Sequence, residues 1–220
     1  MSRVPAWGLI AVLGGACGTD PGPQAAPLRD RPVAARARAL IEPSAREPSP
    51  STSVPEVVDL DGVPADPLGP AAADTTVLVF VGTDCPISNR YAPTLAALDE
   101  GWQSQGVKLW LVYPDPDDAP ATIREHQRRF SLALPTVRDP GHLLVARAGA
   151  VVTPEAAVFV TGVTEPVYRG RIDDRVAERG KVRAEAGAHE LRDAVDAVRR
   201  GVEPEAAGGP PIGCYISDLR

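Results

Sequence analysis

Hydrophobic residues in this chain gather in short runs that are separated by glycine, proline and polar turn residues. Continuous apolar runs are typical of strands that are buried on both faces of a sheet. The last two runs in the chain flank a Thr-Gly turn, which predicts a hairpin. Five segments are predicted to be strands on this basis: 56–68, which runs into a glycine turn, 75–82, 107–113, 156–160 and 166–172. A buried sheet is therefore the expected centre of the fold.

Apolar residues at helical spacing lie between and after these segments. Tyr91, Leu95, Leu98 and Trp102 would share one face of a helix that ends before Gly106. Further helices are expected at 117–130, with Pro120 near the first turn, at 142–150, and along the apolar stripe that ends at 201. The resulting order, β, β, α, β, α, α, β, β, α, predicts an α/β sandwich with helices on both faces of the sheet.

The N-terminal part of the chain lacks these patterns. Segment 1–17 has one arginine, a short apolar run and small residues ending at Cys17, which is typical of a secretory signal and too short for a permanent membrane span. It resembles a bacterial lipoprotein signal, which implies lipidation of Cys17. Leu13 lies four residues before Cys17 and not the usual three, so a plain cleaved signal or an uncleaved anchor remains an alternative.

Residues 18–53 are rich in Pro, Ala, Arg and Ser, a composition that predicts a disordered linker. We therefore expect an exported protein, either periplasmic or attached to the membrane by an N-terminal lipid. Its folded domain would span residues 54–203, and residues 204–220 would form a C-terminal tail with a cysteine.

Composition excludes few functions. The length of 220 residues and the hydrophobic content of 44% suit one domain with a core of ordinary size. The formal net charge of −6 gives no basic surface for nucleic acid, so no nucleic-acid partner is expected.

Cys85 stands at the junction of a predicted strand and a predicted helix. A helix N-terminus offers unpaired N–H groups and a partial positive charge, which stabilise a thiolate. Pro86 would occupy the first helical position, where its missing N–H costs nothing, whereas the neighbouring carboxylate of Asp84 opposes a second anion. The pattern predicts a reactive thiol with a lowered pKa, and a buried, inert cysteine is the alternative.

Two stretches carry a family resemblance. "FVGTDCPISNRYAP" resembles the active-site segment of thioredoxin-fold proteins, with Pro93 at the helix-kinking position, and "VVTPEAAVFV" resembles their cis-proline loop, with Thr153 and Pro154 as the matching pair. With the "YRGRIDD" hairpin, they resemble the bacterial redoxin domains related to alkyl hydroperoxide reductase and thiol-specific antioxidant proteins (AhpC/TSA). The resemblance implies a three-layer thioredoxin-like sandwich with a mixed central sheet, in which Cys85 attacks and the Thr153 backbone docks a thiol or disulfide substrate.

Ser88 occupies the place of the second cysteine in a C-x-x-C pair, so Cys85 cannot form the usual local disulfide. Cys85 would form mixed disulfides, oxidise to sulfenic acid, or pair with another cysteine. Cys214, in a Gly-Cys tail often seen after such domains, is the candidate resolving thiol; an incidental thiol in a frayed tail is the alternative.

A peroxidase that acts on peroxide is a second hypothesis. Peroxiredoxins carry a threonine three residues before the thiol, whereas this chain has Gly82 there and Thr83 one residue later. Copper binding of the Sco type is a third, but Asn89 stands where the second thiolate of C-x-x-x-C belongs, so His142 and Cys214 would have to complete the site.

A non-catalytic domain that binds a partner or a cation is the last alternative. The carboxylates concerned are Asp115, Asp117 and Asp118 in one cluster and Asp173 and Asp174 in another, with Arg169, Arg171 and Arg175 near the second. Such Asp-Pro clusters usually form turns and helix caps, and His126 and His189 are predicted on polar helix faces. No metal or other cofactor is expected.

Overall fold

The computed structural model of the chain describes residues 57–178 and 180–217. The expected signal segment, Cys17 and the linker lie outside these residues. Within the described part of the chain, no helix combines the length and the apolar character needed to cross a membrane.

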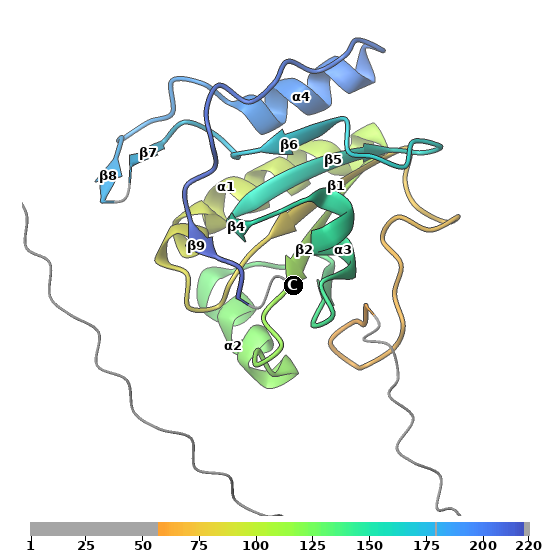
Figure 1. The fold of residues 1–220 in the computed structure, drawn as a ribbon, viewed down its shortest axis with the longest axis vertical. Helices are drawn as coiled ribbons and strands as arrows, with labels where there is room; N and C mark the ends of the chain where they lie inside the picture. Colours follow the sequence, from red (N-terminus) through yellow and green to blue (C-terminus); the bar gives the residue numbers. More distant parts are fainter. Residues whose placement is uncertain (1–56, 179, 218–220) are drawn as a thin grey trace, which may run out of the picture. The chain divides into compact units, whose positions relative to one another are not determined.

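A five-stranded mixed sheet forms the centre of the fold (Figure 1). Its strands, in the spatial order β3-β2-β1-β5-β6, are β3 (Thr136–Arg138), β2 (Val107–Tyr113), β1 (Thr75–Phe80), β5 (Glu155–Val160) and β6 (Tyr168–Gly170). Strand β1 pairs in parallel with β2 and antiparallel with β5. This arrangement confirms the predicted mixed sheet and the predicted hairpin of β5 and β6.

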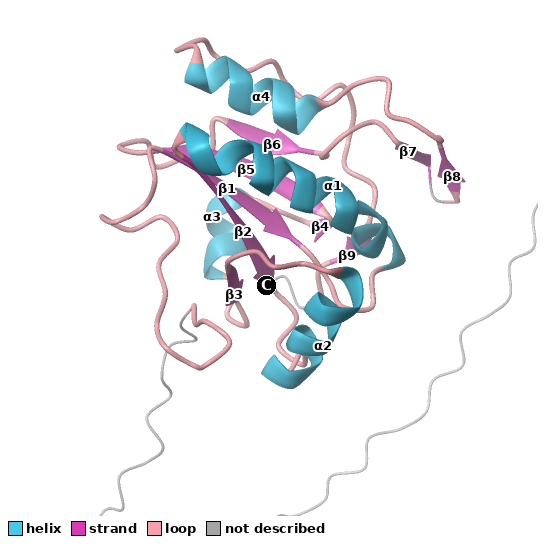
Figure 2. Cartoon of the chain, turned by 180° about the vertical axis from the view of Figure 1, so that it is seen from behind, coloured by secondary structure: helices cyan, strands magenta, loops and turns pink. Residues whose placement is uncertain are grey.

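Helices cover both faces of the sheet, as the sequence predicts. They are α1 (Pro86–Trp102), α2 (Pro120–Phe130), α3 (Leu143–Ala148) and α4 (Glu190–Arg199). Side chains of β1 alternate between two cores: Val77 and Val79 pack with α1 and α4, whereas Leu78 and Phe80 pack with α3. Figure 1 views the sheet from the α3 side and Figure 2 from the α1 side. The fold is the expected three-layer α/β sandwich.

Several local predictions need correction. Of the predicted strand 56–68, the described residues 57–68 form only isolated bridges from Val58, followed by a turn in which Gly62 has a φ of 81°. Helix α2 begins at Pro120 and not at Asp117, with Pro120 in its first turn as expected, and its N-cap residue Ala119 supplies no side-chain cap. Strand β3 and a hairpin of β7 (Val176–Glu178) with β8 (Lys181–Val182) were not predicted, because each strand is too short to show a pattern.

The C-terminal segment returns to the centre of the domain. Strand β9 (Cys214–Tyr215) pairs antiparallel with β4 (Val152–Thr153), and the Ile216 N–H donates to the Val151 carbonyl at 3.1 Å. The Ile216 side chain is buried in the core on the α3 side of the sheet. Residues 204–217, expected as a tail, therefore contribute a strand to the fold.

Candidate active site

Cys85 is the N-cap residue of α1, with Pro86 in the first turn. The Ser88 N–H points at the sulfur, with 3.5 Å between nitrogen and Sγ. This is the helix-start position that the sequence predicts for a stabilised thiolate. The residue is only 3% exposed, so the sulfur lies beneath other parts of the chain.

The Thr153–Pro154 loop is far from Cys85 in the sequence but lies next to it in the fold. The peptide bond between these two residues is cis, as predicted, and Thr153 is buried. The Cys85 thiol donates to the Thr153 carbonyl with 3.0 Å between Sγ and oxygen. The thiol and the cis-proline loop are thus in direct contact, and Pro93 lies inside α1 as expected.

Cys214 joins this pair through strand β9. Thr153 is the register partner of Cys214 in the β4–β9 ladder, and the Cys214 side chain hydrogen-bonds to the Cys85 sulfur. Neither Cys85 nor Cys214 is in a disulfide in this structure. The structure therefore brings together four of the predicted site residues: Cys85, Cys214, Thr153 and Pro154.

Gly213 makes this approach possible and was not singled out by the sequence analysis. A Cβ atom at this position would lie 2.1 Å from the Thr153 carbonyl oxygen and 2.6 Å from its carbon. Both are backbone atoms, so they cannot move aside as a flexible side chain could. The glycine before Cys214 allows β9 to lie directly against the cis-proline loop.

Burial raises the pKa of the Cys85 thiol, but hydrogen bonds to the sulfur outweigh burial and bring the pKa to about 7. The donors are the Cys214 side chain, the side chain and N–H of Ser88, and the Thr153 side chain. The contact with the Thr153 carbonyl works in the other direction, because only a protonated thiol can donate to it. Cys85 is therefore poised between thiol and thiolate near neutral pH.

This pKa predicts how stability depends on pH. A folded pKa of about 7, below the ordinary thiol value of 9.0, means that the thiolate stabilises the fold above pH 9 and that this stabilisation is lost as the pH falls through 7. Two pKa units correspond to about 3 kcal/mol. Under reducing conditions, the free energy of unfolding of the wild type minus that of Cys85→Ser should rise by this order between pH 7 and 9 in urea titrations. A difference that does not change with pH would contradict the lowered pKa.

Two openings lead to the cysteines. A pocket of about 240 Å³ includes both Cys85 and Cys214, and its other lining residues include the carboxylates Asp84, Asp115 and Asp118. A larger groove of about 640 Å³ includes Cys214 but not Cys85. Its lining residues are Pro86, Ile87, Arg90, Val176, Gly180, Val182, Gly213, Cys214 and Tyr215. Cys214 thus lines both openings, whereas Cys85 lines only the acidic one.

A buried hydrogen-bond chain lies behind the site and corrects the prediction for His126. This histidine is buried, where a polar helix face was expected, and its Nε2 lies 2.7 Å from Asn89 Oδ1. Since that oxygen only accepts, Nε2 carries the proton, and Nδ1 accepts from the Tyr113 hydroxyl at 2.9 Å. Burial lowers the His126 pKa, which favours this neutral form. Asn89 Nδ2 in turn donates to the Thr83 carbonyl at 3.3 Å.

Asn89, which stands where a copper protein of this fold would have its second thiolate, thus serves to hold the loop before Cys85. The Thr83 hydroxyl is also engaged, because it donates to Asp118 Oδ1 at 2.6 Å. Burial raises the Asp118 pKa, and the hydrogen bond from Thr83 partly opposes this. Ser88 is buried, and its hydroxyl accepts weakly from the Gly82 N–H at 3.4 Å.

Several of the other candidate ligands make hydrogen bonds within the domain. Asp115 accepts from the Asp117 N–H in a turn, as expected for such a cluster. Asp173 is buried and accepts from the Tyr91 hydroxyl at 2.7 Å, and His142 Nε2 lies 3.0 Å from the Pro114 carbonyl. Among the described residues, no group of three or more His, Cys, Asp or Glu side chains could hold a metal ion.

Sequence comparison agrees with this geometry. Residues 66–169, which include Cys85 and Pro154, match the AhpC/TSA family. The folded domain is a thioredoxin-fold redoxin. This family assignment places the redoxin among the thiol-dependent oxidoreductases. Among curated proteins, no relative of the sequence was found.

Solved structures show the same fold. The redoxin is similar to a hypothetical protein from Sinorhizobium meliloti 1021, with 23% identity, a TM-score of 0.57, and coverage of 66% of this chain and 79% of that chain. It is also similar to an uncharacterized conserved protein from Geobacillus kaustophilus, with 23% identity, a TM-score of 0.61, and coverage of 73% and 86%.

Proposed function

We propose that this redoxin is an exported thiol-disulfide oxidoreductase in which Cys85 attacks and Cys214 resolves. The contact of the Cys214 side chain with the Cys85 sulfur supports the proposal, and so does the pocket that both cysteines line, because together they offer Cys85 a second thiol where the C-x-x-C motif is absent. In the catalytic cycle, the Cys85 thiolate attacks a substrate disulfide and releases one substrate thiol. The Cys214 thiolate then attacks Cys85 in the mixed disulfide, which releases the second substrate thiol and leaves a Cys85–Cys214 disulfide.

The N-terminal segment supports a location outside the cytoplasm, where disulfides persist. Attachment to the membrane through lipidated Cys17 is part of the same proposal. A thiol or disulfide protein is the proposed substrate. A peroxidase receives no specific support, since Gly82 has no hydroxyl to orient a peroxide and the Thr83 hydroxyl is bonded to Asp118.

Peptide mapping without reductant tests the proposed pairing. After mild oxidation of the Cys17→Ser protein with hydrogen peroxide, which converts a thiolate to a sulfenic acid that a second thiol can capture, we expect one linked peptide that contains Cys85 and Cys214, with no sulfinic acid at Cys85. The expectation follows from the contact between the two side chains. Sulfinylated Cys85 beside an unmodified Cys214 would contradict the proposal, and so would linkage only between two protein molecules.

A further inference from the structure

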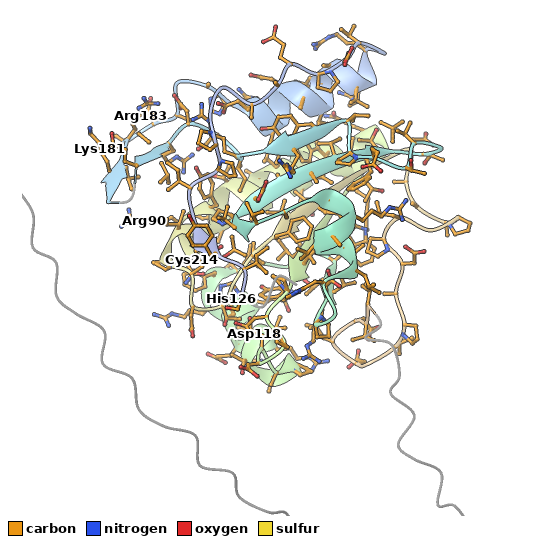
Figure 3. All side chains as sticks on the ribbon, viewed as in Figure 1. Arg90, Asp118, His126, Lys181, Arg183 and Cys214 are labelled. Atoms are coloured by element: carbon orange, nitrogen blue, oxygen red, sulfur yellow. The ribbon has the colours of Figure 1, made fainter. Side chains whose placement is uncertain are left out.

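The groove beside Cys214 has a charge opposite to that of the pocket that leads to Cys85. Arg90 is exposed in the groove and, within the described part of the chain, has no ion-pair partner. Figure 3 places Arg90 on the same side of the domain as Cys214, with Lys181 and Arg183 of the β7–β8 region nearby. Those two cations are paired with Glu178 and Asp174. Among the described residues that line the groove, Arg90 is therefore a positive charge without an ion-pair partner.

The other opening is unfavourable for an anion. Asp84, Asp115 and Asp118 line the smaller pocket through which Cys85 is reached. A thiol attacks a disulfide as its thiolate, so the nucleophile carries a negative charge when it approaches. The acidic pocket opposes this approach, whereas Arg90 favours approach through the groove.

Apolar groups form much of the remaining wall of the groove. Val182 is 39% exposed and Tyr215 is 77% exposed, and both lie beside the partly buried Ile87. Exposed apolar groups grouped in one groove are typical of a surface that contacts a partner. The groove is also more than twice as large as the pocket at Cys85, which suits a peptide segment.

We propose that the reductant of this redoxin is a dithiol protein that presents its cysteine in an extended acidic segment, and that it attacks Cys214 from this groove. The inference rests on the proposed function, because the Cys85–Cys214 disulfide is the bond that is reduced. It adds the identity of the attacked sulfur and the chemistry of the partner.

The chemistry of the leaving group agrees with this direction of attack. The partner thiolate forms a bond to Cys214 Sγ, the Cys85–Cys214 bond breaks, and Cys85 leaves as a thiolate. A low-pKa thiol leaves faster than one with an ordinary pKa, and hydrogen bonds to the sulfur stabilise the Cys85 thiolate. The second partner thiol then loses its proton and attacks the mixed disulfide, and Cys214 leaves and takes up a proton. The partner is oxidised to a disulfide and both cysteines of the redoxin are reduced.

The first experiment identifies the attacked sulfur. The oxidised Cys17→Ser protein is mixed with a capped peptide thiol, Ala-Glu-Cys-Leu-Ala, quenched in acid, denatured and labelled with N-ethylmaleimide. We expect the peptide on Cys214 and the maleimide on Cys85. The reverse labelling would overturn the inference and leave the proposed function intact. Absence of a Cys85–Cys214 disulfide before the peptide is added would instead refute the proposed function.

The second experiment tests the groove without that disulfide. In the Cys17→Ser, Cys85→Ser protein, Cys214 is converted to its mixed disulfide with 5-thio-2-nitrobenzoate, and release of the coloured thiolate is timed. At low salt, the glutamate peptide should react about fivefold faster than its counterpart Ala-Lys-Cys-Leu-Ala. In Arg90→Ala the two peptides should react at about the same rate, whereas in Arg192→Ala, on helix α4, the fivefold difference should remain.

Glutathione, a small thiol, is compared with the glutamate peptide in the same measurement. We expect it to react more slowly than the glutamate peptide, because it cannot cover the apolar wall of the groove. Equal rates for glutathione and the glutamate peptide would overturn the inference that the reductant is a protein. An unchanged ratio of the two peptide rates in Arg90→Ala would overturn the inference that an acidic segment binds in the groove.

Discussion

Cys85→Ser should reduce thiol-disulfide exchange to the background rate while the domain remains folded. A serine hydroxyl does not ionise near neutral pH, so the variant lacks the attacking thiolate. Stability should change little at pH 7 or below, because serine is nearly the same size and is a preferred N-cap residue for α1. Reduction of a fluorescent disulfide peptide measures exchange, and urea unfolding measures stability.

Cys214→Ser is the matched control for this prediction. It retains the Cys85 thiolate, so the first exchange step should persist and the variant should accumulate as a mixed disulfide with the substrate. Full turnover by Cys85→Ser would refute the assignment of the nucleophile. Full turnover by Cys214→Ser would instead refute only the resolving role.

Gly213→Ala should separate β9 from β4 and slow formation of the Cys85–Cys214 disulfide about a hundredfold. The added methyl carbon would lie 2.1 Å from the Thr153 carbonyl oxygen, so the two strands cannot keep their present spacing. A displaced Cys214 would react from a loose tether, at an effective concentration in the millimolar range. Withdrawal of buried Ile216 should also cost about 2 kcal/mol in the free energy of unfolding.

Gly101→Ala provides a glycine control for that variant. A Cβ at this position in α1 meets no atom within 4 Å, so the change should leave disulfide formation as it is in the wild type. It should also raise the free energy of unfolding by about 0.5 to 1 kcal/mol, since alanine favours the helix. Stopped-flow mixing with diamide measures the rate of disulfide formation in both variants. If both alanine variants form the disulfide at the wild-type rate, the close β4–β9 contact does not control the reaction.

The sequence predicts the parts of the fold that depend on long local patterns. The buried runs of β1 and β2 and the apolar stripe of α1 can be recognised because each extends over several strand positions or helical turns. The helix start also predicts correctly that the sulfur receives an N–H, from Ser88. These features predict that Cys85 lies at the start of a helix, but they do not predict which residues pack against it.

The contacts between distant segments could not be predicted in this way. Strand β9 has two residues, so no periodicity indicates that Cys214 returns to Thr153. His126 was assigned to a polar face because its helix neighbours are charged, whereas Tyr113 and Asn89 from other elements bury and bond it. The apolar residues around Cys214 were the available signal, and Ile216 does pack into the core.

The short β4–β9 ladder has a consequence for motion. In the described part of the chain, β9 pairs with β4 at two register positions and the Ile216 N–H adds a flanking hydrogen bond, whereas β1 is paired along its whole length on both sides. A short ladder opens locally at a lower free energy than the whole domain. We therefore expect β9, which lies against Cys85, to open while the five-stranded sheet stays folded.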